Sequence, residues 1–212
     1  WRSFLPYAEC CYQLLQGDAH GALARIAPAC AALRPGIDPA FAVSAYQHVR
    51  VLRELGATPE SLAIARGYAE AFDRHALRGH EPFLLLEVSL LEAQAGEYDA
   101  ALRRLEPVIR AREAAGAIGL ALGMFYETRA RIALLMADRA GFERFAAQCA
   151  SEYAKGESPH LNVMYARLCE DARLRELVSR DATSVPDMVS LRPIREDSDV
   201  EALRTRISEC VD

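Results

Sequence analysis

One segment of the chain reads Gly96-Glu97-Tyr98-Asp99-Ala100-Ala101-Leu102-Arg103-Arg104-Leu105-Glu106-Pro107. The same residue types occur earlier with every spacing kept, at Gly17-Asp18, Ala22-Leu23, Arg25-Ile26 and Pro28. Phe4-Leu5 precedes the first copy at the distance at which Phe83-Leu84 precedes the second. A pattern that recurs in one chain predicts a fold of stacked, repeated units, because one such unit cannot bury its apolar face alone.

Glycine and proline divide the chain into helical stretches. Gly17, Gly56 and Gly96 are about 40 residues apart, and residues 138–141 continue the series. Between them, a Gly is followed three positions later by a Pro, at residues 36–39, 79–82 and 156–159. A Gly can end a helix and a Pro can begin the next one, and we expect Asp38, Glu81 and Ser158 to lie near the N-caps. These joints predict nine helices, at residues 4–16, 19–34, 39–55, 59–77, 82–95, 98–115, 118–137, 140–155 and 159–179.

The segment from Gly96 to Leu102 resembles the Gly-x-Tyr-x-x-Ala-Leu core of a tetratricopeptide (TPR) repeat. The resemblance is strong over residues 83–113, fair over 4–34, and elsewhere rests mainly on helix lengths. It implies an all-α fold, an α-α superhelix (TPR-like solenoid) of about four helix pairs plus a capping helix. The long period is similar to that of repeat arrays in large bacterial signalling proteins.

The helical pattern of the sequence ends near residue 180. We predict a helical repeat domain over residues 1–180, a linker over 181–196 and a short C-terminal helix over 197–212. Ser198-Asp199-Val200-Glu201 forms a capping box that opens this last helix. The helix either caps the array or leads into a following domain.

Composition excludes several classes of protein. Half of the chain, 51%, is hydrophobic, which is incompatible with a disordered chain. The net charge of −5 argues against a nucleic-acid or anionic-membrane surface. No apolar run approaches the roughly 18 residues of a membrane span. Six Cys without a C-x-x-C motif predict buried thiols in the reducing cytoplasm.

The sequence holds no positive sign of catalysis, of a metal site or of a cofactor. No two of the five His lie at the i, i+4 spacing of helical metal ligands. Gly116, Gly119 and Gly123 lack the strand and the Lys of a phosphate-binding loop, and are better explained as close helix packing. The chain has one Lys, Lys155, and one Asn, Asn162, too few for the Lys- and Asn-based carboxylate clamp of some TPR domains.

In the TPR family the first helix of each pair lines a concave groove that holds a partner segment. Tyr, Arg and other polar or aromatic side chains on those helices are therefore the candidate partner-binding residues. They are Tyr12, Gln13, Tyr46, Arg50, Arg53, Phe83, Glu87, Gln94, Tyr126 and Arg129.

The function expected from the resemblance is a cytoplasmic protein-protein interaction scaffold, part of a larger bacterial signalling protein and not itself an enzyme. It would bind a protein or peptide segment in the concave groove, with Arg50 and Arg53 meeting acidic groups. The exposed end of an array would also favour a homodimer. The alternative is a sensory or regulatory domain that binds a small molecule or peptide and relays the signal to a neighbouring kinase, ATPase or transcription-regulator domain.

Overall fold

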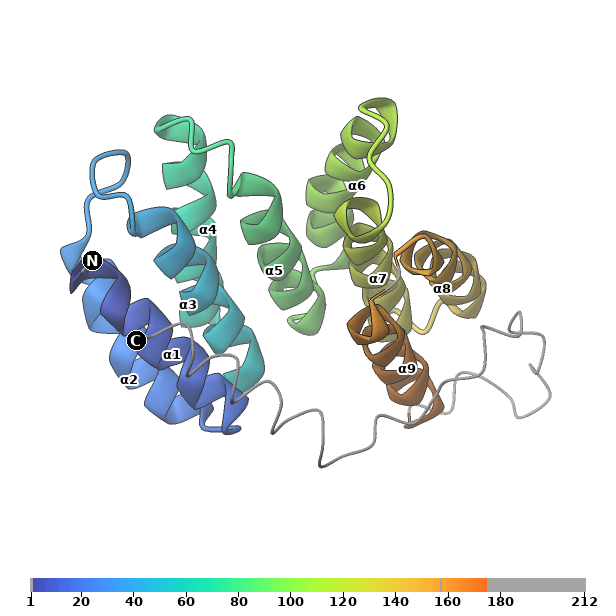
Figure 1. Cartoon of the computed structure of the whole chain (residues 1–212), viewed down its shortest axis with the longest axis horizontal. Coiled ribbons are helices and arrows are strands. Elements are labelled where there is room, and N and C mark those ends of the chain that lie inside the picture. The colour runs from blue at the N-terminus through green and yellow to red at the C-terminus, as the bar shows by residue number, and fades with distance from the viewer. Residues whose placement is uncertain (1, 157, 175–212) are drawn as a thin grey trace, which may run out of the picture. The chain divides into compact units, whose positions relative to one another are not determined.

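The computed structural model describes residues 2–156 and 158–174 (Figure 1). All regular elements in these residues are helices, which confirms the all-α prediction. After a short 3-10 turn at Arg2–Phe4, they are α1 (Leu5–Leu15), α2 (Ala19–Ala32), α3 (Phe41–Leu55), α4 (Pro59–Arg74), α5 (Glu81–Gln94), α6 (Tyr98–Ala114), α7 (Leu120–Leu135), α8 (Arg139–Ala154) and α9 (Pro159–Leu174). The nine helices predicted from the joints are therefore present in the described residues. The predicted linker at 181–196 and C-terminal helix at 197–212 lie outside them.

The glycines that recur along the sequence end helices as predicted. Gly17, Gly56 and Gly96 have φ of 76°, 108° and 82°, a conformation that favours glycine. Helices α2 and α8 start in the same way, because the carboxylates of Asp18 and Asp138 accept hydrogen bonds from backbone N–H groups three residues later.

Two joints differ from the prediction. Asp38 does not cap α3, whose first residue is Phe41; its carboxylate instead accepts bonds from the backbone N–H and the guanidinium of Arg34. Helix α4 ends before Gly79 is reached, because Ala76 takes the left-handed conformation with φ of 52°. In both places a local turn satisfies the backbone earlier than the Gly-Pro pattern suggested.

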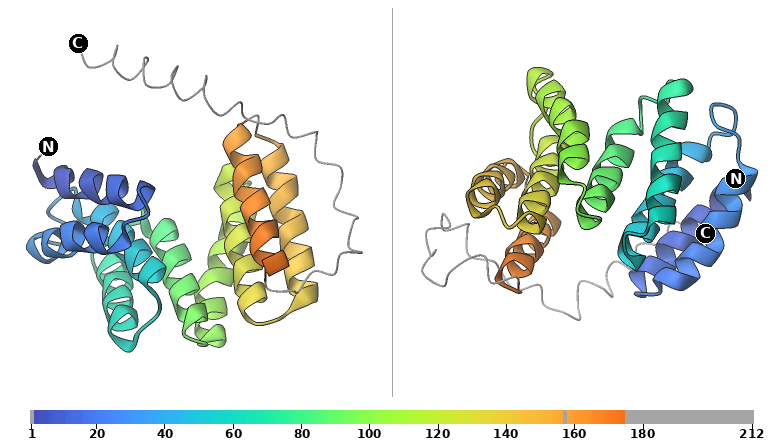
Figure 2. Two further views of the ribbon diagram at one scale, coloured as in Figure 1. Left: turned by 90° about the horizontal axis from the view of Figure 1, so that it is seen from below. Right: turned by 180° about the vertical axis from the view of Figure 1, so that it is seen from behind.

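The odd-numbered helices are in contact one after another: α1 with α3, α3 with α5, α5 with α7, and α7 with α9. Each even-numbered helix contacts the odd-numbered helices before and after it in the chain. Figures 1 and 2 show this succession from three directions. The contacts thus join helices that are near one another in sequence.

The core runs as three successive clusters with shared helices. The first is built from α1, α2 and α3, the second from α3, α4 and α5, and the third from α5 to α9. Helix α5 contributes to two of them, with Leu84, Val88 and Leu91 in the second and Leu86 and Leu90 in the third. A helix that is apolar on opposite faces must be covered on both.

Equivalent residues of the two sequence copies have the same environment. Ala22 and Ala101 are fully buried, and so are Ile26 and Leu105. Tyr98, the aromatic residue of the second copy, donates its hydroxyl to the backbone carbonyl of Leu135 at the end of α7, at 3.0 Å. The sequence repeat is therefore a repeat of packing positions.

The glycines at the α6–α7 joint and in the first turn of α7 have different roles. A Cβ on Gly123 would lie 2.5 Å from the ring of Tyr153 in α8, so only glycine fits there. Gly119 has φ of 63°, and its N–H donates to the carboxylate of Glu152 at 2.9 Å. The packing prediction is therefore confirmed for Gly123, whereas Gly116 and Gly119 have open space at the Cβ position and are distinguished by positive φ.

A buried carboxylate ties α4, α5 and α6 together. Glu92 of α5 is fully buried, and its oxygens accept bonds from Arg66 Nε at 3.1 Å and from Arg104 Nε and Nη2 at 3.0 and 2.9 Å. Arg66 also bonds Glu97. Removing one partner of a buried ion pair is costly because the remaining charges lose their compensation.

We predict that Glu92→Ala lowers the free energy of unfolding by about 2–4 kcal/mol, since it leaves two guanidinium groups without their shared acceptor. The matched control is Glu97→Ala, which removes a half-exposed partner of Arg66 and should cost less than about 1 kcal/mol. Urea denaturation of both variants checks this. Equal losses would show that the buried position of Glu92 has no special importance.

The core also contains a neutral histidine. His48 is 5% exposed, and its Nδ1 lies 2.8 Å from the hydroxyl oxygen of Tyr68. Burial lowers the pKa of His48 from 6.5 to about 4. Below pH 6.5 the unfolded chain therefore binds a proton that the folded chain excludes until pH falls to about 4, so stability decreases as pH falls through this window.

We predict that His48 alone removes about 2–3 kcal/mol of stability between pH 7.5 and 4.5. His48→Asn retains a polar atom near the position of Nδ1 and should flatten the pH dependence by that amount, although it is less stable at pH 7.5. Urea denaturation at a series of pH values measures the slope. His20→Asn, at an exposed position, is the control; identical slopes for the two variants would refute the role of His48.

Candidate functional site

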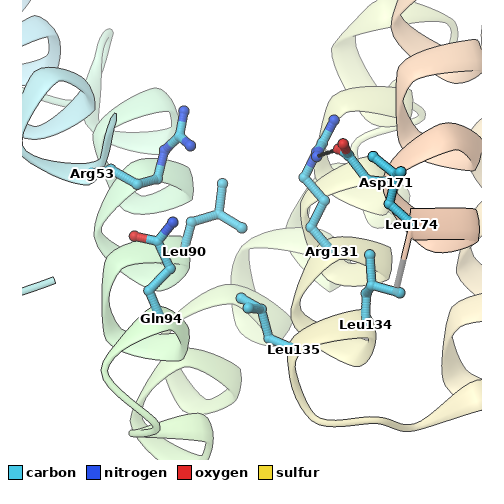
Figure 3. Close-up of a pocket in the computed structure, with 8 residues that line it drawn as sticks. All are labelled: Arg53, Leu90, Gln94, Arg131, Leu134, Leu135, Asp171 and Leu174. Atoms are coloured by element: carbon cyan, nitrogen blue, oxygen red, sulfur yellow. Dashed lines mark hydrogen bonds and ion pairs between the residues drawn. The ribbon is translucent and has the colours of Figure 1, made fainter. Parts of the chain in front are cut away.

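A cavity of about 260 Å³ lies between the odd-numbered helices α3, α5, α7 and α9 (Figure 3). One wall consists of Arg53 from α3 and of Leu90 and Gln94 from α5. The other wall consists of residues from α7 and α9, namely Arg131, Leu134, Leu135, Asp171 and Leu174. We call this space the α5–α7 cavity.

The first wall carries an ion-pair network between α3 and α5. Arg53 donates from Nε to Glu87 at 2.5 Å and from Nη2 to Glu54 at 2.8 Å. Its burial lowers the pKa of Arg53, but the two carboxylates outweigh that effect and raise it above its usual value. The guanidinium is thus held in place and remains charged.

The second wall repeats this arrangement between α7 and α9. Arg131 donates from Nε to Glu127 at 3.0 Å and from Nη1 to Asp171 at 2.5 Å. Burial lowers the pKa of Arg131, but Glu127 and Asp171 raise it by more, so the net shift is upward. The hydroxyl of Tyr153 also donates to Glu127, at 2.7 Å, and this second bond helps to hold the carboxylate in place.

Leucine side chains line the space between the two networks. Leu90 and Leu134 are 8% and 5% exposed and belong to the core cluster below. Leu135 is partly buried, and Leu174 is 74% exposed. The cavity therefore combines an apolar surface with a fixed ion-pair network on each wall, which is the composition of a surface for an apolar side chain with polar neighbours.

A second hollow lies over α4, α5 and α6, and is lined by the Glu92 network with Ala100 and Arg103. Its carboxylates are those that bind Arg66 and Arg104. These side chains hold three helices together. The charged residues that line this hollow are therefore explained by their role in holding the helices together.

Five of the predicted binding residues lie close together where α3 meets α5. Tyr46 packs edge-on against Phe83, with ring centroids 6.5 Å apart. Arg53 binds Glu87, and Arg50 is exposed one turn earlier on α3. Of these five, Arg53 lines the cavity. Gln94, near the end of the same helix α5, also lines it.

The structure places the two predicted residues of α1 elsewhere. Tyr12 is 61% exposed and shares an open apolar face with Leu5 and Leu15, which are 58% and 84% exposed. Gln13 is partly buried. Neither residue lines the α5–α7 cavity.

The two predicted residues of α7 are buried between helices. Tyr126 is 6% exposed, and its hydroxyl donates to Glu113 of α6 at 2.6 Å. Arg129 is also 6% exposed, and its guanidinium carbon lies 4.6 Å from the ring centroid of Phe145 in α8. Burial lowers the pKa of Arg129. Both side chains pack toward α6 or α8 and do not line the cavity.

Most residues of the cavity lining were not predicted from the sequence. The missed residues are Leu90, Arg131, Leu134, Leu135, Asp171 and Leu174. One of them could have been found from the repeat, because α5 and α7 end 41 residues apart, and this shift carries the predicted Gln94 to Leu135. Asp171 and Leu174 had no comparable signal.

Other site classes find no support in the described part of the chain. No group of three or more His, Cys, Asp or Glu there could hold a metal ion. No helix of the same residues is long and apolar enough to cross a membrane. Comparison of the sequence and structure with protein-family models, curated proteins and solved structures gives no match.

Proposed function

We propose that this chain is a protein-interaction module that binds a segment of another protein in the α5–α7 cavity. One observation carries the proposal: an apolar surface lies between two fixed ion-pair networks on the odd-numbered helices. Such a surface can bury an apolar side chain of a partner and order the polar groups beside it.

The proposal includes a TPR-like superhelical solenoid. It is supported by the contacts of each odd-numbered helix with the next and by the equivalent burial of Ala22 with Ala101 and of Ile26 with Leu105. In a solenoid each unit contacts its neighbours and creates an extended binding surface. The odd-numbered helices would be the first helices of their pairs and would line that surface.

The alternative of a small-molecule sensor has less support. The cavity, about 260 Å³, is smaller than the roughly 300–1,000 Å³ of typical small-molecule pockets. The two guanidinium groups that line it are already bonded to carboxylates of the chain. A surface that accepts one or two side chains of a longer segment fits this geometry better, and the same bonding argues against a catalytic role for these groups.

The setting of the module is also part of the proposal. A cytoplasmic location rests on the scattered cysteines, and a larger bacterial signalling protein rests on the long repeat period. Self-association as a homodimer rests on the exposed apolar face of Leu5, Tyr12 and Leu15 on α1. An exposed apolar helix face of this kind favours association.

The test is a selection from a displayed random-peptide library against the immobilised chain. We expect peptides that bind the native chain and lose at least about tenfold in affinity, or about 1.4 kcal/mol, in Gln94→Trp. Gln94 is exposed and lines the cavity, so an indole there fills the space without entering the core.

Gln16→Trp is the matched control, because Gln16 is exposed at the C-terminal end of another odd-numbered helix, α1. It should leave binding unchanged, and both variants should keep the thermal unfolding midpoint of the native chain. The proposal fails if no peptide is enriched, or if the enriched peptides bind Gln94→Trp as well as they bind the native chain.

A further inference from the structure

The chemistry of the α5–α7 cavity narrows the class of partner, on the premise that the proposed function is correct. Each of its two guanidinium groups is already bound by two carboxylates of the chain. Arg53 binds Glu54 and Glu87, and Arg131 binds Glu127 and Asp171. Two positive and four negative groups leave an excess of negative charge around the apolar surface.

Within these ion pairs, the most exposed groups are carboxylates. The side chains of Glu54 and Asp171 are 46% and 44% exposed, whereas those of Arg53 and Arg131 are 20% and 28% exposed. Asp171 lines one wall of the cavity, and Glu54 is bonded to Arg53 of the other wall. Arg50 and Arg167 are exposed one turn away on α3 and α9 but do not line the cavity.

An acidic partner would meet this surface unfavourably. A carboxylate from the partner would share each guanidinium with the two carboxylates of the chain that already neutralise its charge. A Lys or Arg from the partner would find an open acceptor at Glu54 or Asp171. Charged groups at the edge of an interface select partners by this kind of complementarity.

The leucine surface supplies the other half of the recognition. Leu90, Leu134, Leu135 and Leu174 offer an apolar contact beside the two ion-pair networks. An aliphatic or aromatic side chain of the partner would be buried there, and its removal from water would provide most of the binding energy.

We propose that the α5–α7 cavity binds a cationic segment of a partner protein, in which an apolar side chain is flanked on both sides by Lys or Arg. This assignment differs from the expectation that Arg50 and Arg53 meet acidic groups, because the ion pairs of Arg53 were not visible in the sequence.

The test compares the composition and affinity of the peptides selected on the native chain. The enriched sequences should carry Lys or Arg on both sides of an apolar residue. The strongest binder and its copy with Gln at the basic positions are then synthesised, and their Kd values are measured by fluorescence anisotropy at low and high salt. We expect the basic peptide to bind at least about fivefold more tightly and to weaken with salt.

The matching protein variant is Glu54→Gln/Asp171→Asn, which keeps the side-chain shapes and removes the two half-exposed charges. It should weaken the basic peptide by about fivefold and leave the Gln-containing copy unchanged. Glu60→Gln/Asp99→Asn, at two exposed positions outside the cavity, is the control and should change neither affinity.

The outcomes test the binding site and the class of partner separately. Peptides that depend on Gln94 but are acidic or uncharged overturn the cationic partner and leave the binding site standing. Basic peptides whose affinity is unaffected by Glu54→Gln/Asp171→Asn also overturn it. The absence of any peptide that depends on Gln94 overturns the proposed function and, with it, the partner class.

Discussion

Helix α5 must bury apolar side chains on two opposite faces, and this constraint organises the described part of the chain. Leu84, Val88 and Leu91 pack toward α3 and α4, while Leu86 and Leu90 join the cluster that extends to α9. Its one fully buried charge, Glu92, is compensated by Arg66 and Arg104 from the helices on either side in sequence. Both apolar packing and charge compensation therefore require α5 to lie between its neighbours.

The same helix connects stability with the candidate site. Leu90 belongs to the core cluster and also lines the α5–α7 cavity, as does Leu134 on α7. The floor of the site is thus the outer surface of the core, and it cannot rearrange without disturbing the packing beneath. The ion pairs of Arg53 and Arg131 fix the polar edges in the same way. Such a surface is preorganised, which reduces the ordering cost of binding.

Local chemistry explains which parts of the fold could be predicted from the sequence. Glycines with positive φ, such as Gly17, Gly56 and Gly96, can be recognised directly in the sequence. The same is true of helices with apolar periodicity. The predictions at Asp38 and Gly79 were wrong in detail. Asp38 bonds the backbone N–H of Arg34 and does not cap α3, and the turn at Ala76 ends α4 before Gly79. Those outcomes depend on competition between turns, which the spacing of Gly and Pro does not show.

The candidate site was harder to predict from the sequence than the fold was. Tyr46, Arg53 and Phe83 were predicted on the first helices of two successive pairs, and the structure places them where α3 meets α5. Helix α7 is apolar around most of its circumference, so its periodicity did not distinguish the face of Tyr126 and Arg129 from the face of Arg131 and Leu135. The bond between Arg131 and Asp171 joins residues 40 positions apart, and only the folded chain brings them together.

The most direct test of the binding site is to map a bound peptide onto the chain. Amide chemical shifts of the isotope-labelled protein would be followed as a selected peptide is added. The account predicts that the largest changes fall on residues 90–94 of α5 and 131–135 of α7, with further changes in α9 near Asp171. Changes confined to α1, or to the Phe145 side of α8, would contradict it and place binding on another surface.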